Sequence, residues 1–466
     1  MPIPVITVAQ MREWEKATWA IGQTEADVIR LVGKRVAERA LQITRPAELI
    51  LILAGKGHNG EDARAAREHL KDRRVDLLEV KDLAADLSKL DAILSLGPSL
   101  VIDGLFGIGL NRALSPDWVR FIEKLNASRR KILAVDVPSG LNAETGQPEG
   151  AAVESTITLT VGAPKRGLLA KSAWKYVGRL EVATRVGLVY CPISSDMQWT
   201  LAEDFAEFPP PRVVYSHKGT YGHLAILAGS RGYHGASVLA ARGAQRAQPG
   251  LITLHSEESI YSSVAAQLQA VMVAPWATKI DLSQSYSGIL IGPGLAAADL
   301  PQELKALTGR VWCESPLPVI VDASALAWLP SQATPERAIR VMTPHPGEAA
   351  RLLGTTSDEV QSDRSAALKQ LSARFGGCHV VLKGHQTMVG RSTGPLFVNS
   401  SGNPHLAQGG SGDTLSGFLA GLLAQPGLQA DALTTIRYAV WKHGAAADEL
   451  QASRPGWVVE ELVEGL

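Results

Sequence analysis

The sequence has few cysteines and no excess of either charge. Its three cysteines, Cys191, Cys313 and Cys378, stand far apart with no C-x-x-C spacing, which argues against a disulfide framework and against a thiolate metal site. Lysine plus arginine and aspartate plus glutamate each number 46, so no general positive field favours nucleic acid. We therefore expect a protein of the reducing cytoplasm that binds no nucleic acid.

Long apolar runs and targeting signals are also lacking. No run approaches the ~18–20 apolar residues that span a bilayer, and the N-terminal sequence MPIPVITVAQMREWEKA lacks the basic start and long apolar region of a signal peptide. No repeat of about 20–50 residues is visible, and there is no low-complexity tail. We expect a globular protein without a membrane partner.

What the sequence does contain is a regular alternation of short apolar runs and longer helical patterns. At 466 residues the chain is long enough for two or three domains, since a domain usually holds ~100–200 residues. The consecutive prolines of EFPPPR cannot continue a helix or a central strand. We place a linker around residues 205–212 and expect domains at 1–207 and 212–466.

Both domains are predicted to be α/β. In the first, the alternation is typical of a doubly wound, Rossmann-like parallel sheet with helices on both faces, with expected strands at Leu49–Ala54, Leu100–Asp103, Ile132–Asp136 and Ile157–Val161. The second domain is expected to hold a different sheet, with strands at Leu224–Ala228, Leu251–Leu254, Gly288–Ile291, Pro318–Asp322, Val341–Thr343 and Val380–Lys383 and a hairpin of Thr387–Val389 and Pro395–Val398.

A glycine-rich stretch, NPHLAQGGSGDTLSG, carries one carboxylate, Asp413, directly before an apolar helix expected from Thr414. Gly409, Gly410 and Gly412 allow a tight turn whose bare N–H groups can approach an anion, and the helix adds its positive dipole end. This pattern predicts a phosphate site beside a catalytic base. The alternative is a flexible loop followed by a helix whose N-cap is Asp413.

Further signals fall where strands of the second domain are expected to end, the edge at which open α/β sheets bind ligands. They are Gly229–Gly235, Gly292–Gly294, Asp322, Thr343–Glu348 and Lys383–Thr387. His345 lies between two prolines, which favours a substrate-facing role over that of a solvated or structural histidine. Lys383 is expected to contact a nucleotide, the alternative being an exposed lysine at a strand end.

These motifs carry a family resemblance. SHKGTYGH, LAGSRGYHGA, GPGL, TPHPGEAARLLG, VLKGHQT and NPHLAQGGSGDTLSG follow one another over roughly residues 212–466, in an order and spacing that resemble the ADP-dependent NAD(P)H-hydrate dehydratases. The resemblance implies a ribokinase-like α/β/α sandwich. It also implies the removal of water from the hydrated nicotinamide ring of NADHX or NADPHX, with ADP (or ATP) as co-substrate and Mg²⁺.

The resemblance also implies roles for individual residues. It implies that the hydrated dinucleotide contacts Ala236, Gly294, His345 and Asp413, with Asp413 as the catalytic centre. It implies an ADP site formed by Lys383, Gly384, His385, Gln386, Thr387, Asn403, Gly409, Gly410, Ser411 and Gly412. The chain departs from the family pattern at Ser324, at His405-Leu406 and at Gln408, from which we expect altered affinity before lost activity.

Motifs of the first domain resemble the NAD(P)H-hydrate epimerase domain that the family often fuses ahead of the dehydratase. They are GKGHNGED, DGLFGIGLNR, DVPSGL and APKRGLL, within roughly residues 5–205, and each alone could be a capped turn. The resemblance implies K⁺ ligands at Asn59, Asp103 and Ser139 and Asp136 as the base that interconverts the R and S hydrates. It implies dinucleotide contacts at His58, Asn59, Gly60, Glu61, Asp62, Gly107, Ile108, Gly109, Leu110, Asn111, Arg112, Ala113 and Asp136.

The first domain departs further from its pattern. Glu61 and Ala63 stand where the family has glycines that let the dinucleotide approach, Ile108 replaces a threonine, and Arg30 and Leu31 replace an acid and an amide. A carboxylate beside a pyrophosphate is repulsive unless it faces away.

Two alternatives therefore remain open. In the first alternative, the N-terminal domain is only a binding or oligomerisation module. In the second, the C-terminal domain is a ribokinase-like kinase that phosphorylates a small alcohol. The family likeness suggests a homo-oligomer and, as its size, a tetramer. The sequence does not decide between ADP and ATP as co-substrate or between NADHX and NADPHX as substrate.

Overall fold

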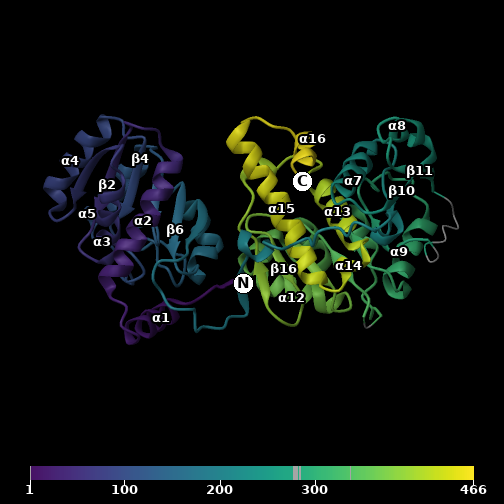
Figure 1. The fold of residues 1–466 in the computed structure, drawn as a ribbon, viewed down its shortest axis with the longest axis horizontal. Coiled ribbons are helices and arrows are strands. Elements are labelled where there is room, and N and C mark those ends of the chain that lie inside the picture. The colour runs from purple at the N-terminus through teal and green to yellow at the C-terminus, as the bar shows by residue number, and fades with distance from the viewer. Residues whose placement is uncertain (1, 277–281, 283–284, 336) are drawn as a thin grey trace. The chain divides into compact units, whose positions relative to one another are not determined.

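The computed structural model describes residues 2–276, 282, 285–335 and 337–466 and divides into two compact units (Figure 1). The N-terminal unit holds Ile3–Ser195, and the C-terminal unit begins at Asp196. The boundary thus precedes the linker expected at 205–212. Strand β8 (Met197–Trp199) already pairs with β17 (Leu396–Val398), and Arg437 Nη2 donates to Asp204 Oδ2 at 2.7 Å. The prolines therefore lie inside the C-terminal unit.

The N-terminal unit is built on a parallel sheet in the order β3-β2-β4-β5-β6-β7. The strands are β2 (Leu49–Ala54), β3 (Arg74–Glu79), β4 (Leu100–Gly104), β5 (Ile132–Val135), β6 (Ile157–Val161) and β7 (Arg179–Ala183). The chain passes from β2 to β3 on one side and then crosses to β4 on the other. The switch point between β2 and β4 is where a doubly wound sheet binds its ligand.

Helices cover both faces of this sheet, as the sequence predicted. One core contains residues of α2 (Glu25–Ile43) and α3 (His58–Ala66) with Ile50 and Ile52 of β2, and the other contains residues of α4 (Leu83–Ser95) and α5 (Pro116–Ala127) with Leu51 and Leu53. Because neighbouring strand residues point to opposite faces, this alternation means that β2 is buried on both sides. Helix α1 (Val8–Ala20) adds Met11 and Trp14 to the first core.

The C-terminal unit holds a larger mixed sheet whose order from β8 is β8-β17-β16-β15-β14-β13-β12-β9-β10-β11. Its further strands are β9 (His223–Leu227), β10 (Leu251–Ser256), β11 (Met272–Pro275), β12 (Gly288–Ile291), β13 (Val319–Val321), β14 (Arg340–Met342), β15 (His379–Leu382) and β16 (Met388–Gly390). The strands from β9 to β15 run parallel, and β16 and β17 form the expected antiparallel hairpin. Strand order reverses at β9, between β10 and β12.

This sheet is also covered on both faces, which confirms the α/β/α sandwich. Residues of α7 (His234–Arg246), α13 (Ser411–Leu423) and α15 (Ala432–Ser453) form one core with Val381 of β15. Val380 and Leu382 point to the opposite face and are fully buried too, where α12 (Arg364–Arg374) packs against β15 and β16. Helices α9 (Gln302–Glu314) and α10 (Pro346–Leu353) connect the later strands.

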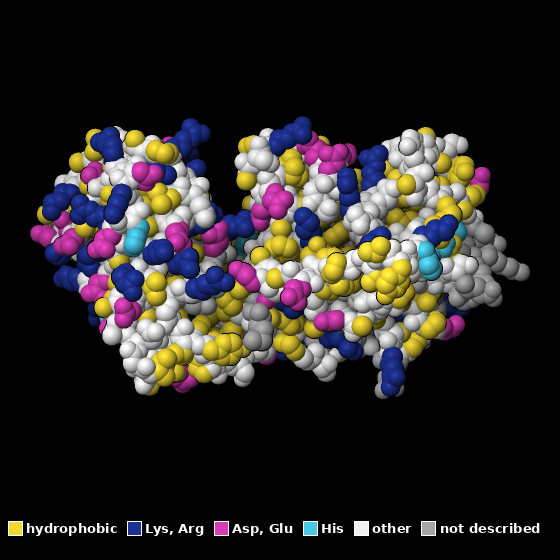
Figure 2. Space-filling model, viewed as in Figure 1, with side chains coloured by type: hydrophobic (Ala, Val, Ile, Leu, Met, Phe, Trp, Pro, Cys, Tyr) yellow, Lys and Arg dark blue, Asp and Glu magenta, His cyan; other side chains and the backbone are white. Residues whose placement is uncertain are grey.

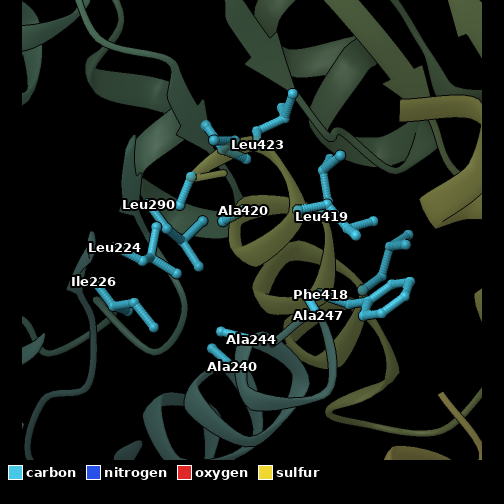
Figure 3. Packing of buried hydrophobic residues seen from close by; sticks show 14 of the residues in the cluster. Leu224, Ile226, Ala240, Ala244, Ala247, Leu290, Phe418, Leu419, Ala420 and Leu423 are labelled. Atoms are coloured by element: carbon cyan, nitrogen blue, oxygen red, sulfur yellow. The ribbon is translucent and has the colours of Figure 1, made fainter. Parts of the chain in front are cut away.

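Small residues let α13 and α7 approach each other closely. In Figure 3, Ala240 and Ala244 lie on the side of α7 that faces α13, and Phe418 of α13 lies beside Ala247, the residue that follows α7. A Cβ atom on Gly417 would lie 1.9 Å from the carbonyl oxygen of Ala240. The contact therefore requires glycine at this position, and it holds the helix that begins at the glycine-rich loop against the sheet.

The charged side chains and the cysteines are distributed as the equal numbers of acids and bases and the wide cysteine spacing suggest. Basic and acidic side chains are interspersed over the face shown in Figure 2. Cys191, Cys313 and Cys378 are all free thiols. Within the described part of the chain, no helix combines the length and the apolar character needed to cross a bilayer.

The close contact between α7 and α13 gives a stability prediction. Gly417→Ala adds a methyl group against the Ala240 carbonyl, and we expect it to lower the free energy of unfolding by about 1–3 kcal/mol, the usual cost of overpacking. Gly427→Ala, where no atom lies within 4 Å of the added carbon, is the matched control and should not destabilise. Calorimetric unfolding of both variants tests this, and equal midpoints would contradict the packing argument.

Candidate active sites

A cavity of about 1280 Å³ lies at the carboxyl ends of β2, β4 and β5 in the N-terminal unit. Its wall contains His58, Asn59, Asp62, residues 107–113 and Asp136, so the structure brings together most of the residues that the motifs singled out for the dinucleotide. The sequence could place them at one sheet edge, because each follows a parallel strand. Their convergence on one cavity is a property of the tertiary structure.

Two of the predicted dinucleotide contacts, Gly60 and Glu61, do not lie on this wall. A Cβ atom on Gly60 would lie 2.1 Å from the Gly55 carbonyl oxygen, so this glycine serves the packing of α3, and Glu61 is exposed. The reason is helical: α3 begins at His58, and successive residues of a helix point in directions about 100° apart. Only part of the motif can face the cavity.

Of the departures from the family pattern, Ile108 lines the cavity, whereas Glu61, Ala63, Arg30 and Leu31 do not. Ala63 is fully buried and packs against Gly104, where an added Cβ atom would lie 2.4 Å from the Ala63 methyl. Arg30 is exposed and pairs with Asp27 at 3.2 Å, while Val28 and Ile29 line the cavity. The expected repulsion between Glu61 and a pyrophosphate therefore does not arise on the cavity wall.

The cavity also contains groups that the motifs did not indicate. Besides the predicted contact Arg112, its wall carries the cations Arg12, Lys56 and Lys81 and the aromatic rings Trp19, Phe106 and Trp118. Cationic side chains suit phosphates, and flat rings suit stacking with a base or a nicotinamide. Arg12 lies on α1, far from any strand-end motif, so only hydrophobic patterning of that helix could have suggested its orientation.

Asp136 is held rigidly at the edge of the cavity. Its backbone has a left-handed φ of 61°, and its Oδ1 accepts hydrogen bonds from Lys165 Nζ at 2.5 Å, Thr160 Oγ1 at 3.0 Å and Val161 N at 2.9 Å. Lys165 is fully buried. Positive φ is costly for an aspartate, and such strain is typical of functional positions.

Two more carboxyl groups face the same cavity as Asp136. Burial raises the pKa of Asp62 well above its ordinary value, and the charges of Asp136 and Glu61 raise it further. Burial, with Asp136 as the next cause, also raises the pKa of Glu15. Carboxyl groups with raised pKa exchange protons more readily near neutral pH. The wall can therefore do acid–base chemistry.

A polar cluster under the loop after β4 contains the three predicted K⁺ ligands. Ser139 donates from Oγ to Asp103 Oδ1 at 2.6 Å and from N to Asp103 Oδ2 at 2.8 Å. Asn59 Nδ2 donates to Phe106 O at 2.7 Å, and Phe106 N donates to Ser139 Oγ at 2.8 Å. Burial raises the pKa of Asp103 to about 6, although the hydrogen bonds from Ser139 oppose the rise.

This cluster fits a hard monovalent cation. Carboxylate, amide, hydroxyl and main-chain oxygens are hard donors, and a bound cation would stabilise the buried Asp103 carboxylate. Across residues 2–276, 282, 285–335 and 337–466, no group of three or more His, Cys, Asp or Glu side chains could hold a metal ion. The Asn59, Asp103 and Ser139 cluster does not count as such a group, because Asp103 is its one acidic member and the other two ligands are an amide and a hydroxyl.

In the C-terminal unit, α13 begins earlier than expected. Its first residue is Ser411, and Gly410 is the N-cap with a left-handed φ of 93°. Asp413 therefore lies in the first turn of the helix, neither before a helix starting at Thr414 nor at its N-cap. Burial raises the pKa of Asp413 to about 7, Asp322 adds to the rise and Lys383 opposes it. A carboxyl group of this kind can serve as a base near neutral pH.

Lys383 lies beside this carboxylate and is mostly buried, not an exposed strand-end lysine. Its Nζ donates to Asp322 Oδ1 at 2.8 Å, and Thr343 Oγ1 donates to the same oxygen at 2.7 Å. The Nζ lies 3.3 Å from the place that a Cβ atom on Gly412 would take. Glycine at 412 thus lets the ammonium group reach the loop before Asp413.

His345 caps a helix with one ring nitrogen, and its other ring nitrogen, Nε2, lies 3.6 Å from Glu348 Oε1. Its Nδ1 accepts hydrogen bonds from Gly347 N at 3.0 Å and Glu348 N at 3.4 Å, which caps α10. Burial lowers its pKa, and Lys383 and Arg351 lower it further while Glu348 opposes them. Because Nδ1 accepts, the neutral ring carries its hydrogen on Nε2 and can donate it to a ligand.

Ala236 and Gly294 meet at the switch point beside β9. Gly294 has a φ of 67°, and a Cβ atom on it would lie 3.0 Å from the Ala236 methyl and 2.5 Å from Tyr233 O. Ser230 Oγ donates to Gly294 O at 2.7 Å and ties the two loops together. Both predicted substrate contacts therefore lie where an open sheet binds ligands.

Positive φ angles and side-chain hydrogen bonds shape the two segments that are predicted to bind ADP. Gly384 has a φ of 120° and Gln386 one of 51°, and Thr387 Oγ1 donates to Gly384 O at 3.0 Å. Asn403 Nδ2 donates to Asp448 Oδ1 at 3.1 Å.

Side chains at and near the glycine loop support its shape. Gln408, which departs from the family pattern, donates to His405 O at 2.8 Å and so closes the loop on itself. His443 was not expected from the sequence: its Nε2 lies 3.0 Å from Ser411 O, and burial lowers its pKa to about 4. It supports the start of α13.

The pKa of Asp413 gives a prediction about stability and pH. Below the ordinary aspartate pKa of 3.8, Asp413 is protonated in both the folded and the unfolded protein, so its burial costs no charge. As the pH rises above 3.8, the unfolded protein loses this proton first, and the resulting loss of folding stability is complete above about pH 7. Asp413→Asn removes this cost. We expect it to stabilise the protein at pH 8, by at most about 4 kcal/mol, and much less at pH 5. Urea unfolding at both pH values measures this, and an equal difference at both would contradict it.

Comparisons with known proteins find a family model for part of each unit. A family model described as NAD(P)H-hydrate dehydratase matches residues 224–462, and one described as YjeF-related protein N-terminus matches residues 76–167. The latter range contains the loop after β4, Asp136 and Lys165, and the former contains all the predicted C-terminal site residues.

Relatives match over nearly the whole chain. The bifunctional NAD(P)H-hydrate repair enzyme of Coxiella burnetii is 32% identical over 94% of this chain and 93% of its own length, and that of Gloeobacter violaceus is 34% identical over 99% and 97%. A ribokinase-like superfamily protein of Enterococcus faecalis, of known structure, is 26% identical with a TM-score of 0.50, covering 59% of this chain and 95% of its own. The chain belongs to the family of bifunctional NAD(P)H-hydrate repair enzymes.

Proposed function

We propose that this protein repairs hydrated nicotinamide dinucleotides with two active sites. The C-terminal site removes water from S-NADHX or S-NADPHX with a nucleotide as co-substrate, and the N-terminal site converts the R hydrate into the S form. The observation that carries the proposal is the placement of Asp413, with its pKa of about 7, beside Lys383 and at the start of a glycine-capped helix.

Dehydration needs the ring hydroxyl to become a better leaving group. Asp413 takes the hydroxyl proton as the oxygen attacks the terminal phosphorus of ADP, the bond from that phosphorus to AMP breaks, and AMP leaves. The lone pair of the ring nitrogen then expels phosphate, and loss of a proton from the neighbouring carbon restores the double bond. The products are the reduced dinucleotide, AMP, phosphate and a proton.

The C-terminal residues would hold the two substrates around Asp413. Lys383 and the N–H groups at the start of α13 attract the phosphates, and His345 Nε2 offers a donor to the hydrated dinucleotide. Mg²⁺ would enter with the nucleotide and neutralise part of the phosphate charge, as it does at most phosphoryl-transfer sites. ADP is the co-substrate that the family resemblance favours, and ATP is the alternative.

Asp413→Asn tests the dehydratase assignment. Asparagine cannot take the hydroxyl proton, so the ADP-dependent recovery of NADH absorbance from S-NADHX should fall by about 10²-fold or more. Consumption of R-NADHX by the N-terminal site should stay unchanged, which serves as the internal control for folding. Turnover close to that of the wild type would rule out Asp413 as the base.

Epimerisation requires the same ring hydroxyl to leave and return on the other face. A carboxyl group gives the hydroxyl a proton, the ring nitrogen expels water, and water adds from the opposite face as a base removes its proton. Asp136, held by Lys165, is the proposed base, and the raised pKa values of Asp62 and Glu15 make these groups the proton donors available on the cavity wall.

Asp136→Asn tests the epimerase assignment. We expect the accelerated consumption of R-NADHX to fall by about 10²-fold or more, while ADP-dependent dehydration of S-NADHX stays normal. The measurement is the rate of R-NADHX loss compared with spontaneous epimerisation in buffer. A wild-type rate equal to the spontaneous one would instead make the N-terminal unit a binding or oligomerisation module.

Further features of the protein belong to the same proposal. K⁺ would be held by Asn59, Asp103 and Ser139 and would neutralise the buried Asp103 carboxylate beneath the dinucleotide cavity. We also infer a homo-oligomer, with a tetramer as the state that the family likeness favours, and a cytoplasmic location, where the three free cysteines remain reduced.

A further inference from the structure

A buried guanidinium lies directly beneath the segment 383–387. Arg364, the first residue of α12, is only 8% exposed. Its Nη2 donates to the carbonyl oxygens of Leu382 at 2.9 Å and Lys383 at 3.3 Å, and its Nη1 donates to Gln361 Oε1 at 2.5 Å. The side chain therefore holds the last residue of β15 and the first residue of the loop together.

The positive charge of Arg364 is not balanced by an acid. Among the described residues no ion pair includes it, its Nε has no hydrogen-bond partner, and burial alone lowers its pKa to about 10. The start of a helix is the positive end of its dipole, which makes the position less favourable still for a cation. A charge buried at such cost needs an anion nearby or a structural reason.

The loop above Arg364 has a shape that needs support. An added Cβ atom on Gly384 would lie 3.3 Å from Arg364 Nη1, and Gln386 has a left-handed φ of 51° with a buried Nε2 that lacks a partner. These are the residues next to Lys383, whose ammonium group faces the loop before Asp413. Fixing the carbonyls of 382 and 383 thus fixes where Lys383 points.

We propose that Arg364 is a positioning residue of the nucleotide site, which presets the backbone of 383–387 for ADP and whose charge is balanced by the phosphates when the nucleotide binds. This rests on the proposed function, because it takes segment 383–387 as part of the ADP site. Arg364 acts through the backbone, since its guanidinium reaches the loop from below.

The chain offers a matched control in Arg340. It too is buried, at 1% exposed, burial lowers its pKa to about 10, and it donates to the carbonyl oxygens of Trp312 at 2.6 Å and Leu317 at 2.8 Å. It begins β14, so it lies at the amino edge of the sheet, opposite to the edge at which β15 ends. Loss of Arg340 should weaken the fold without reshaping the nucleotide loop.

The test compares Arg364→Met, Arg364→Lys and Arg340→Met in the full-length protein. We expect Arg364→Met to raise KM for ADP about tenfold or more, the effect of losing charged hydrogen bonds, with KM for S-NADHX within about twofold, and to reduce the rise in melting temperature that ADP causes in the wild type. Arg364→Lys keeps the positive charge but loses the paired N–H donors of the guanidinium, so its KM for ADP should lie between those of the wild type and Arg364→Met. Arg340→Met should lower the melting temperature and leave KM for ADP unchanged.

Three results would overturn the inference. The first is an unchanged KM for ADP in Arg364→Met, or in Arg364→Lys should the methionine variant fail to fold. The second is an equal rise in KM for both substrates, which marks a purely structural role. The third is a wild-type enzyme whose turnover of S-NADHX does not respond to ADP or ATP. This result would also overturn the proposed function, whereas the first two results would leave the proposed function standing.

Discussion

A parallel sheet that is buried on both faces leaves only its edges for polar chemistry, and each unit of this protein is built under that constraint. Val380, Val381 and Leu382 of β15 are fully buried, and the first polar side chain after them, Lys383, lies where the strand leaves the sheet. The same holds in the N-terminal unit, where Asp103 and Asp136 lie at the ends of β4 and β5. Polar side chains gather at these ends because every other part of the strand is enclosed by helices.

Each unit also stabilises its acids with a buried lysine, but with different results. In the N-terminal unit Lys165 bonds directly to Asp136 and fixes it against the cavity. In the C-terminal unit Lys383 bonds to Asp322, so the charge of Asp413 is only partly compensated and burial raises its pKa to about 7. One arrangement orients a carboxylate, and the other makes a carboxylate a stronger base. This difference suits a site that returns water to a ring and a site that removes a hydroxyl proton.

Several departures from the family pattern direct their side chains away from the cavity, although Ile108 lines it. Ala63 fills a buried contact between α3 and Gly104, and Glu61 is exposed on the helix outside the cavity wall. In the C-terminal unit Gln408 bonds within its own loop. A substitution in a motif alters the chemistry only where the side chain faces the ligand, and in these positions the backbone directs it elsewhere.

Local patterning was sufficient for much of this protein. Apolar runs located the main strands to within a residue or two, and the α/β folds followed from their alternation. The motifs placed Lys383 and Asp136 at strand ends and Asp413 between a glycine-rich turn and a helix. Patterning could not show that Gly60 and Glu61 lie off the cavity, because that depends on how α3 is rotated against the sheet. It could not show that α13 starts at Ser411, since only the left-handed Gly410 decides it.

The tertiary structure alone decided the remaining parts of both sites. Arg12 and Glu15 reach the N-terminal cavity from α1, His443 supports Ser411 across 32 residues, and Arg364 lies under a loop that follows it by 19 residues. No local pattern marks these side chains, because a single charged residue on a helix looks the same whether it faces water or a buried carbonyl. The sequence by itself determined the two α/β folds and placed the motifs at the ends of their strands, because both follow from local patterning. Packing over long separations determined which other side chains surround those motifs.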